Sequence, residues 1–362
     1  EVLHFARLAH VGGVAERAKG KGRRARVGAG RDSRWRGHRS GEGGGEGESE
    51  SEGEGDSSPA WRCEEGAIVV DCTAGMGGHS AAIARDLCCQ IEDMKQRGKN
   101  CATPRLFMFD SDISNLQYAV SNVKKVCEGH SVEVEGVHSN FRHVGERVGG
   151  HPVEGEGKVS YILADIGFCS TQVDDVERGF SYRMSDAVLD MRYNQSEGIP
   201  AWQFIRNVGS RQLENVFTSL GELPSGVSKR LALTLSSHKP HTVNEMRAAV
   251  AEALTKGKNR SPSFHAEQMP QIFQALRIAV NDELGSLITL MESIPSLLRS
   301  GGIAAIISFH SLEDRLVKRK FRELSKDGAF TLLTSKPVCP SDEEKAENAR
   351  ARSAKLRAVM KV

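Results

Sequence analysis

A glycine-rich loop between a short apolar strand and a helix is the feature that most constrains this fold. Residues 69–80 read Val-Val-Asp-Cys-Thr-Ala-Gly-Met-Gly-Gly-His-Ser, and the acid Asp71 closes the strand. Glycines allow a sharp turn and a close ligand approach, while free N–H groups at a helix start favour a polar or anionic ligand. The loop therefore predicts a nucleotide-like cofactor bound between a strand and a helix of an α/β sheet.

The glycine spacing separates two cofactor classes. A dinucleotide fold uses G-x-G-x-x-G, whereas Gly75, Gly77 and Gly78 form G-x-G-G, four residues after Asp71. This spacing favours S-adenosylmethionine (SAM), and we expect Asp71 to face its sulfonium and amino-acid end. Glycine loops alone are weak motifs, so a dinucleotide remains open at this point.

An acid at the end of the next strand completes the pattern of a nucleoside site. The apolar run 106–109 ends on Asp110, which is placed to accept the hydrogens of both ribose hydroxyls. The separation between this acid and the glycine loop exceeds the usual twenty or so residues. The polar stretch 90–104 predicts a surface insertion that accounts for the excess.

Four predicted strands, each followed by loop or helix signals, indicate a doubly wound parallel sheet. The third spans residues 132–137 and leads to Phe141, and the fourth spans residues 159–164 and ends on Asp165. Ligands bind at the carboxyl ends of such strands. We therefore expect the strand-ending acids and Phe141 to gather at one edge of the sheet.

Six sequence blocks, in order between residues 66 and 362, closely resemble those of the bacterial-type small-subunit ribosomal RNA (cytosine-N4)-methyltransferases. The blocks begin at Asp71, Asp165, Leu189, Phe273, Ile307 and Asn348. The resemblance implies a class I SAM-dependent methyltransferase, with a Rossmann-like parallel sheet and an inserted helical lobe. It also implies methylation of the exocyclic amine of one cytosine in the decoding region, with small-subunit rRNA or the assembling small subunit as partner.

The resemblance assigns roles to individual residues. Besides Asp71 and Gly75, the implied SAM contacts are Gly77, Gly78, His79, Asp110, Phe141, Asp165 and Gln172. Asp165 is also the candidate catalytic acceptor for the amine hydrogens. A role in binding the cofactor alone is an equal alternative. For His79 and His310, cofactor packing or a structural role is favoured over the role of a base. Alignment of amine, methyl and sulfur supplies most of the catalysis.

Two other functions compete with N4-methylation. Cys169 stands in the loop after Asp165 where the family has serine, so C5-methylation through a cysteine thiolate is one alternative. A non-catalytic ribosome assembly protein with the same fold is the other. The eight cysteines form no C-x-x-C pair, so we expect no metal and a reducing compartment.

Composition and helical periodicity divide the chain into four segments. A partial helix and a disordered Gly, Glu and Ser tract are expected in residues 1–59, the methyltransferase core in residues 60–175 and 269–362, and a helical substrate-recognition lobe in residues 176–268.

Cations of the lobe and of the C-terminal tail are the predicted RNA contacts. They are Arg178, Arg183 and Arg192 of the lobe, and Arg350 and Arg352 of the tail. An internal ion pair of Asp190 with an arginine is nearly as favoured for the lobe, and a solvated face is the alternative for the tail.

The arginine-rich, acid-poor start resembles an organelle transit peptide, although a low-complexity insertion over residues 12–58 is the favoured interpretation. Both interpretations favour a location in a mitochondrion or plastid over the alternative, a bacterial cytoplasm. No apolar run approaches the eighteen or so residues needed to cross a membrane, so no membrane partner is expected.

Overall fold

The computed structural model describes residues 66–100, 102–148, 157–183, 187–255 and 262–362. The predicted N-terminal segment 1–59, with its insertion and its targeting alternative, lies outside the described residues. The sheet, the helices of the lobe and the tail lie within them.

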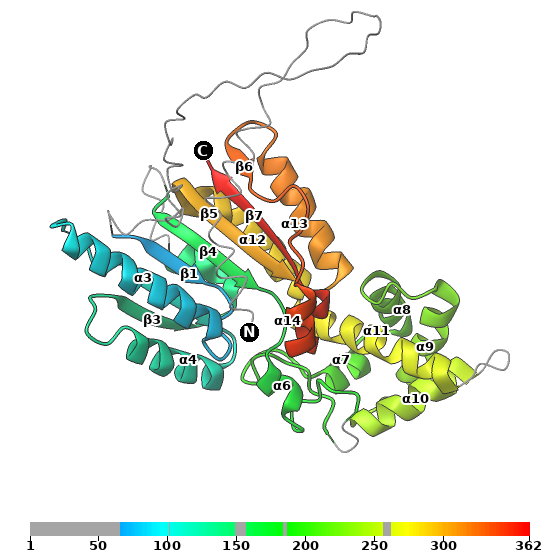
Figure 1. Cartoon of the computed structure of the whole chain (residues 1–362). Helices are drawn as coiled ribbons and strands as arrows, with labels where there is room; N and C mark the ends of the chain where they lie inside the picture. The colour runs from blue at the N-terminus through cyan, green and yellow to red at the C-terminus, as the bar shows by residue number, and fades with distance from the viewer. Residues whose placement is uncertain (1–65, 101, 149–156, 184–186, 256–261) are drawn as a thin grey trace, which may run out of the picture.

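A seven-stranded sheet forms the centre of the molecule, in the order β3-β2-β1-β4-β5-β7-β6 (Figure 1). The strands are β1 (Ile68–Asp71), β2 (Arg105–Asp110), β3 (Glu133–His138), β4 (Val159–Asp165), β5 (Leu298–Ser308), β6 (Phe330–Leu332) and β7 (Lys355–Lys361). The first five are parallel, and β7 runs antiparallel to both β5 and β6. This topology confirms the predicted fold class, a Rossmann-like α/β sheet of the class I methyltransferase type.

Helices cover both faces of the sheet, so successive strand residues are buried on opposite sides. Val69 packs with α3 and α4 on one face, and Val70 packs with α12 and α13 on the other. These helices are α3 (Gly78–Gln96), α4 (Ile113–Val126), α12 (Glu283–Leu297) and α13 (Ser311–Leu324). With both faces covered, a ligand can reach the strands only at their ends.

Helix α3 corrects one prediction. Residues 90–96 do not belong to a surface insertion, because α3 continues to Gln96 and buries Ile91 and Met94 against the sheet. Apolar residues recur at helical spacing along this stretch, which the polar residues between them obscure. The long separation between the glycine loop and Asp110 therefore comes from a longer helix.

A helical lobe lies between β4 and β5 in the sequence and extends away from the sheet (Figure 1). Its helices are α7 (Ala201–Asn207), α8 (Ser210–Ser219), α9 (Ser225–His238), α10 (Val243–Thr255) and α11 (Pro262–Asn281). They share a hydrophobic cluster separate from those of the sheet, and α11 contributes Met269 and Leu276 to it. The predicted segment boundaries, including the one at residue 269, stay predictions. Within the described ranges, no helix is long and apolar enough to span a membrane.

Candidate functional site

A cavity of about 690 Å³ opens at the carboxyl ends of β1, β2, β4 and β5, where the lobe meets the sheet. Ligand pockets commonly enclose roughly 300–1,000 Å³, so a nucleoside and a second group fit this volume. The predicted residues that line the cavity are Gly75, Gly78, His79, Asp110, Phe141, Asp165 and Gln172. The structure thus brings together residues spread over almost a hundred positions of the sequence.

The glycine loop forms one wall of the cavity through its backbone. Gly75 and Gly77 have φ values of 50° and 83°, a left-handed conformation that glycine adopts without steric cost. A Cβ on Gly77 would lie 3.0 Å from the Cα of Ala119 in α4. Gly77 therefore allows α3 to pack on α4; it does not line the cavity, and its cofactor contact stays a prediction.

Asp71 is fully buried behind the loop. Its carboxylate accepts hydrogen bonds from the Ser80 hydroxyl at 2.5 Å and from the Thr73 N–H at 3.1 Å. Burial raises the pKa of Asp71. The expectation that this acid faces the sulfonium is wrong, because its oxygens face the loop and the start of α3, which they hold to the end of β1.

Asp110 ends β2 at the cavity, as predicted. Oδ2 accepts the Gly75 N–H at 2.7 Å, and Oδ1 accepts the Asp112 N–H at 2.7 Å. Burial raises the pKa of Asp110 to about 6. Each carboxylate oxygen has a second lone pair, so this group can fix the glycine loop and still accept two hydroxyl hydrogens.

Asp165 ends β4 beside the glycine loop. Its N–H donates to the Thr73 hydroxyl at 2.8 Å, and its Oδ2 lies 3.3 Å from Nε2 of His79. Burial lowers the pKa of His79, but the Asp165 carboxylate outweighs it, so the pKa is raised overall. Oδ1 of Asp165 and both ring nitrogens of His79 are buried and make no hydrogen bond within the described structure. These atoms are available to a polar ligand.

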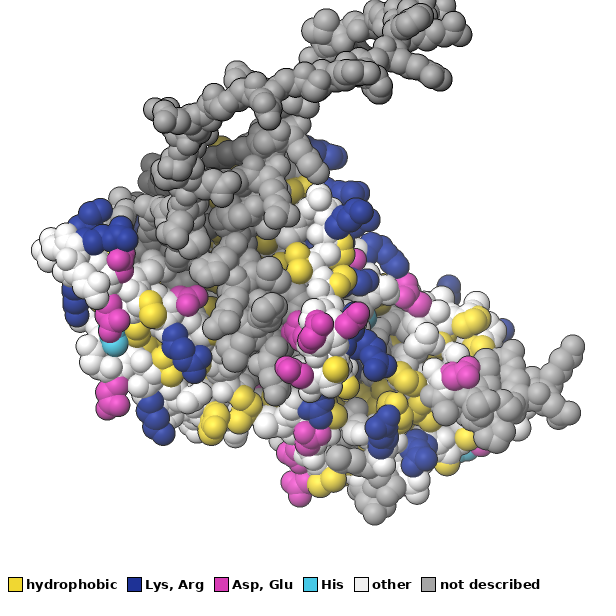
Figure 2. All heavy atoms as spheres, in the orientation of Figure 1, with side chains coloured by type: hydrophobic (Ala, Val, Ile, Leu, Met, Phe, Trp, Pro, Cys, Tyr) yellow, Lys and Arg dark blue, Asp and Glu magenta, His cyan; other side chains and the backbone are white. Residues whose placement is uncertain are grey.

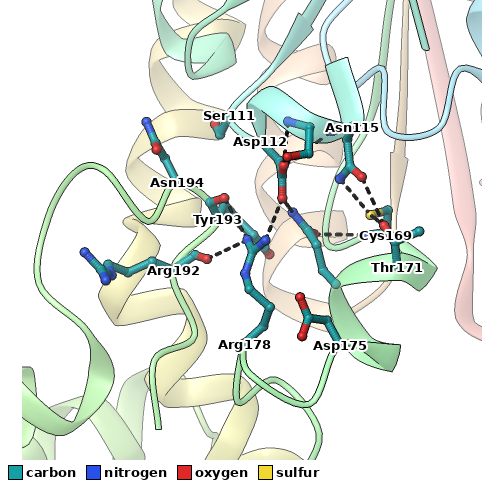
Figure 3. A network of polar contacts seen from close by, with 12 residues as sticks. Ser111, Asp112, Asn115, Cys169, Thr171, Asp175, Arg178, Arg192, Tyr193 and Asn194 are labelled. Atoms are coloured by element: carbon teal, nitrogen blue, oxygen red, sulfur yellow. Dashed lines mark hydrogen bonds and ion pairs between the residues drawn. The ribbon is translucent and has the colours of Figure 1, made fainter. Parts of the chain in front are cut away.

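A buried ion pair joins the lobe to the sheet beside the cavity (Figure 3). Asp112 accepts a hydrogen bond from Arg178 at 2.7 Å and one from the Gln172 amide at 3.3 Å. Arg178 also donates to the carbonyl groups of Arg192 and Tyr193. Burial raises the pKa of Asp112, but Arg178, together with the hydrogen bonds from Gln172 and the Asn115 N–H, outweighs it, so the pKa is lowered overall. The pair fixes Gln172, which lines the cavity.

The three lobe arginines predicted to contact RNA differ in environment. Arg178 is only 9% exposed and its charge is paired with Asp112, so its predicted RNA contact is wrong. Arg192 donates to both carboxylate oxygens of Asp190 at 2.8 Å, which is the internal pair left open by the sequence. Arg183 is exposed, and its RNA contact stays a prediction.

The two tail arginines lie in a short 3-10 turn, η3 (Ala349–Ser353), at the rim of the cavity. Arg350 lines the rim and pairs with Asp174 at 2.8 Å. Arg352 is exposed on the same turn. The Arg350 guanidinium can therefore reach a ligand that enters the cavity from solvent, and Arg352 lies two residues further along the same exposed turn.

Cys169 lines the cavity just before the short helix α6 (Ser170–Asp174) (Figure 3). Its Sγ lies 3.1 Å from the donating amide nitrogen of Asn115 and 2.8 Å from the hydroxyl oxygen of Thr171. An amide and a hydroxyl do not remove a proton from a thiol. The contacts therefore suit a positioned polar side chain better than an activated nucleophile.

The far end of the cavity contains residues that the sequence analysis missed. Glu283 is buried, and its two oxygens accept hydrogen bonds from Arg277 at 2.7 and 3.0 Å. The Tyr193 hydroxyl donates to the same carboxylate at 2.9 Å. The sequence contained a signal for this charged group, because Arg277 interrupts an otherwise apolar stretch of helix within one of the six blocks.

His310 and Glu313 complete this end of the cavity. Glu313 accepts the Phe309 N–H at 2.9 Å through Oε2, and its Oε1 lies 3.0 Å from Nε2 of His310. His310 is the N-cap residue of α13, and Ser311 is the first residue of the helix. The Ser311 hydroxyl donates to Glu222 at 2.5 Å.

Three side chains at this end have the chemistry of metal ligands. Glu283, His310 and Glu313 offer ligand atoms that all lie within 4.8 Å of one another. Both oxygens of Glu283 already accept from Arg277, whose positive charge opposes a bound cation. The expectation that the chain holds no metal stays a prediction.

Comparison with known proteins agrees with this geometry. The sequence profile of the MraW methylase family matches residues 59–362. A ribosomal RNA small subunit methyltransferase H of Acaryochloris marina is 38% identical over 295 residues, covering 81% of this chain and 88% of the relative. Its namesake in Synechocystis sp. is 36% identical over 301 residues (82% and 88%), and that of Acidobacterium capsulatum is 35% identical over 299 residues (82% and 92%).

Proposed function

This chain belongs to the MraW methylase family, and from that premise we propose that it methylates N4 of one cytosine in small-subunit rRNA, using SAM. The observation that carries the proposal is one cavity that joins a nucleoside-type site to a second acid. Asp110 and the glycine loop form the nucleoside-type site, and Asp165, on the neighbouring part of the sheet, is the second acid.

The residues present suit SAM. Gly75 and Gly78 offer the backbone of a loop at a helix start, and Asp110 offers two oxygens to the ribose hydroxyls. The unpaired Oδ1 of Asp165 and the ring nitrogens of His79 offer buried polar atoms to the rest of the ligand. SAM supplies a methyl group that its sulfonium charge has already activated.

Asp165 is our candidate for holding the target amine. The lone pair of a cytosine amine is delocalised into the ring, so a carboxylate that accepts an amine hydrogen favours the nucleophilic geometry. Thr73 and His79 hold Asp165 from two sides. The base must leave its helix to reach this depth, and Phe168, which is 42% exposed at the cavity, offers an aromatic face for it to stack on.

Cys169→Ser separates N4 from C5 chemistry. We expect the variant to retain most of the turnover, because a hydroxyl fills the same place between Asn115 and Thr171 and no covalent adduct is required. Mass spectrometry of digested RNA should show N4-methylcytidine from both proteins. Loss of turnover in the variant, or covalent trapping by 5-fluorocytosine RNA, would assign C5-methylation instead.

The RNA surface is proposed to run from the η3 turn along α13. Figure 2 shows Lys and Arg side chains along α13. A shallow groove there is lined by the cations Arg315, Lys318, Arg319, Arg322 and Lys326. Phosphate contacts of this kind set affinity and make it depend on salt.

Combining Arg350→Ala with Arg352→Ala should weaken RNA binding and reduce the slope of its salt dependence by about two. SAM affinity should not change, since neither side chain is among the proposed cofactor contacts. The matched control is Lys124→Ala with Lys125→Ala, two exposed cations of α4 on the opposite side of the sheet. Unchanged RNA binding across a salt titration would move the RNA surface to the lobe near Arg183.

The relatives named above are bacterial, so we propose a ribosome of bacterial type as the substrate. A bacterial cytoplasm fits these relatives, and the mitochondrial or plastid location stays a proposal. Mapping methylated cytosines in rRNA with and without the protein identifies the target base. A protein that leaves every cytosine unchanged would instead be a ribosome assembly factor.

A further inference from the structure

We propose that His310 accepts one hydrogen of the target amine, while Glu313 holds its imidazole in place. The proposal rests on the proposed N4-methylation and adds a second acceptor beside Asp165. It assigns a function to the far end of the cavity, which the SAM site leaves unexplained.

The topology places His310 next to Asp165. Strands β4 and β5 are parallel neighbours, and Asp165 is in register with Ile307. His310 follows Ile307 by three residues, so the two side chains leave adjacent strand ends, and both line the same cavity. A base bound in this cavity can therefore be contacted by residues that follow both strand ends.

The polar atoms of this pair are buried without hydrogen bonds. Nδ1 and Nε2 of His310 and Oε1 of Glu313 have no partner within the described structure. Nε2 and Oε1 are 3.0 Å apart, but the angles of this contact do not form a hydrogen bond. Nε2 and Oε1 face each other across this contact, so Nδ1 of His310 is the atom left without a partner at the cavity, and because buried polar atoms are nearly always paired it indicates a missing ligand.

The start of α13 is a capping box in which the His310 side chain faces the N–H of Glu313, but the imidazole makes no hydrogen bond there. Oε2 of Glu313 already accepts the Phe309 N–H, and also the His310 N–H at 3.4 Å. Metal binding is the less suitable alternative, because Arg277 holds both oxygens of Glu283. A neutral base with hydrogens to donate is the ligand that suits the remaining atoms.

The chemistry follows from the histidine tautomer. With its hydrogen on Nε2, toward Glu313, His310 presents Nδ1 as a lone-pair acceptor. The cytosine amine has two hydrogens, one for Asp165 and one for His310. The amine nitrogen forms a bond to the methyl carbon, and the methyl–sulfur bond breaks with its electrons left on sulfur. One amine proton passes to Nδ1 and then to solvent.

The test is His310→Gly, because glycine is tolerated at an N-cap and leaves space for added imidazole. Turnover should fall about 100-fold, as is typical when a proton acceptor is lost, and SAM affinity should change by less than about threefold. Imidazole in solution should restore turnover at least about tenfold, which replacement of a purely structural side chain would not allow.

A binding measurement complements the kinetics. Wild-type protein should bind RNA with the target cytosine more tightly than RNA with an abasic site there, and His310→Gly should lose most of this preference. The control is His238→Gln, which removes an exposed histidine that lies 2.8 Å from Glu252. If glycine prevents SAM binding, His310→Asn, another favourable N-cap, replaces it and must show the same losses of turnover and of preference.

Two failures are distinguishable. A wild-type protein that forms no N4-methylcytidine would overturn the proposed function and this inference with it. If the wild type forms that product, then turnover near normal in His310→Gly, or no restoration by imidazole, would overturn the role of His310 alone.

Discussion

Asp110→Ala is expected to weaken SAM binding by about 100-fold or more, because it removes two charge-assisted hydrogen bonds of roughly 1.5–3 kcal/mol each. In the wild-type protein one oxygen accepts the Gly75 N–H and the other the Asp112 N–H, and both retain a lone pair for the ribose. The substitution therefore also releases the glycine loop. Isothermal titration calorimetry with SAM measures the loss.

Asp93→Ala is the control, since it removes an exposed acid at the far end of α3 that pairs with Arg97 at the surface. Unchanged SAM affinity in a folded Asp110→Ala protein, or tighter binding of a dinucleotide than of SAM, would contradict the site.

Repeating the titration at lower pH adds a second readout for Asp110. Burial raises the pKa of Asp110 to about 6. Below that pH its carboxyl group is protonated in the free protein, and this proton must be lost before the carboxylate can accept hydrogen bonds from both ribose hydroxyls. Wild-type affinity should fall as the pH drops from 7 to 5, by up to about tenfold per pH unit below the pKa. Asp110→Ala should retain only the part of this pH dependence that other titratable groups contribute.

Asp165→Asn is expected to lower turnover about 100-fold, because an amide oxygen accepts an amine hydrogen more weakly than a carboxylate does. The shape of the side chain and the backbone hydrogen bond to Thr73 are preserved. SAM affinity should therefore change by less than about fivefold. Single-turnover methylation and SAM titration, run side by side, measure the two quantities.

The ratio of the two losses decides between the roles left open for Asp165. An equal fall in SAM affinity and in turnover would assign Asp165 to cofactor binding alone. Turnover near normal would exclude both roles, cofactor binding and acceptance of an amine hydrogen. Asp327→Asn, at an exposed position after α13, controls for the loss of one negative charge.

Several features of the site were predictable because they depend on neighbours in the sequence. An apolar run that ends on an acid gave Asp110 and Asp165, and the rule that parallel strands bind ligands at their carboxyl ends placed both at one cavity. The glycine spacing likewise identified the loop. Such signals arise from backbone geometry, which a few adjacent residues fix.

Other features were not predictable, because burial and charge pairing depend on residues distant in the sequence. Asp71 has the same sequence setting as Asp110, yet Ser80 and Thr73 take up its oxygens away from the cavity. Arg178 resembles an RNA contact until Asp112, 66 residues earlier, is seen to neutralise it. Arg277 and Glu283 likewise face the cavity only because α11 and α12 bring them there.

The parallel sheet, the loop at its first strand and the acids at its strand ends could be predicted from the sequence, because apolar periodicity and glycine position act locally. Only the tertiary structure decided which charged groups face a ligand and which hold the lobe to the sheet. The physical reason is that a charge becomes internal when folding brings it a partner, and that partner can come from any part of the chain.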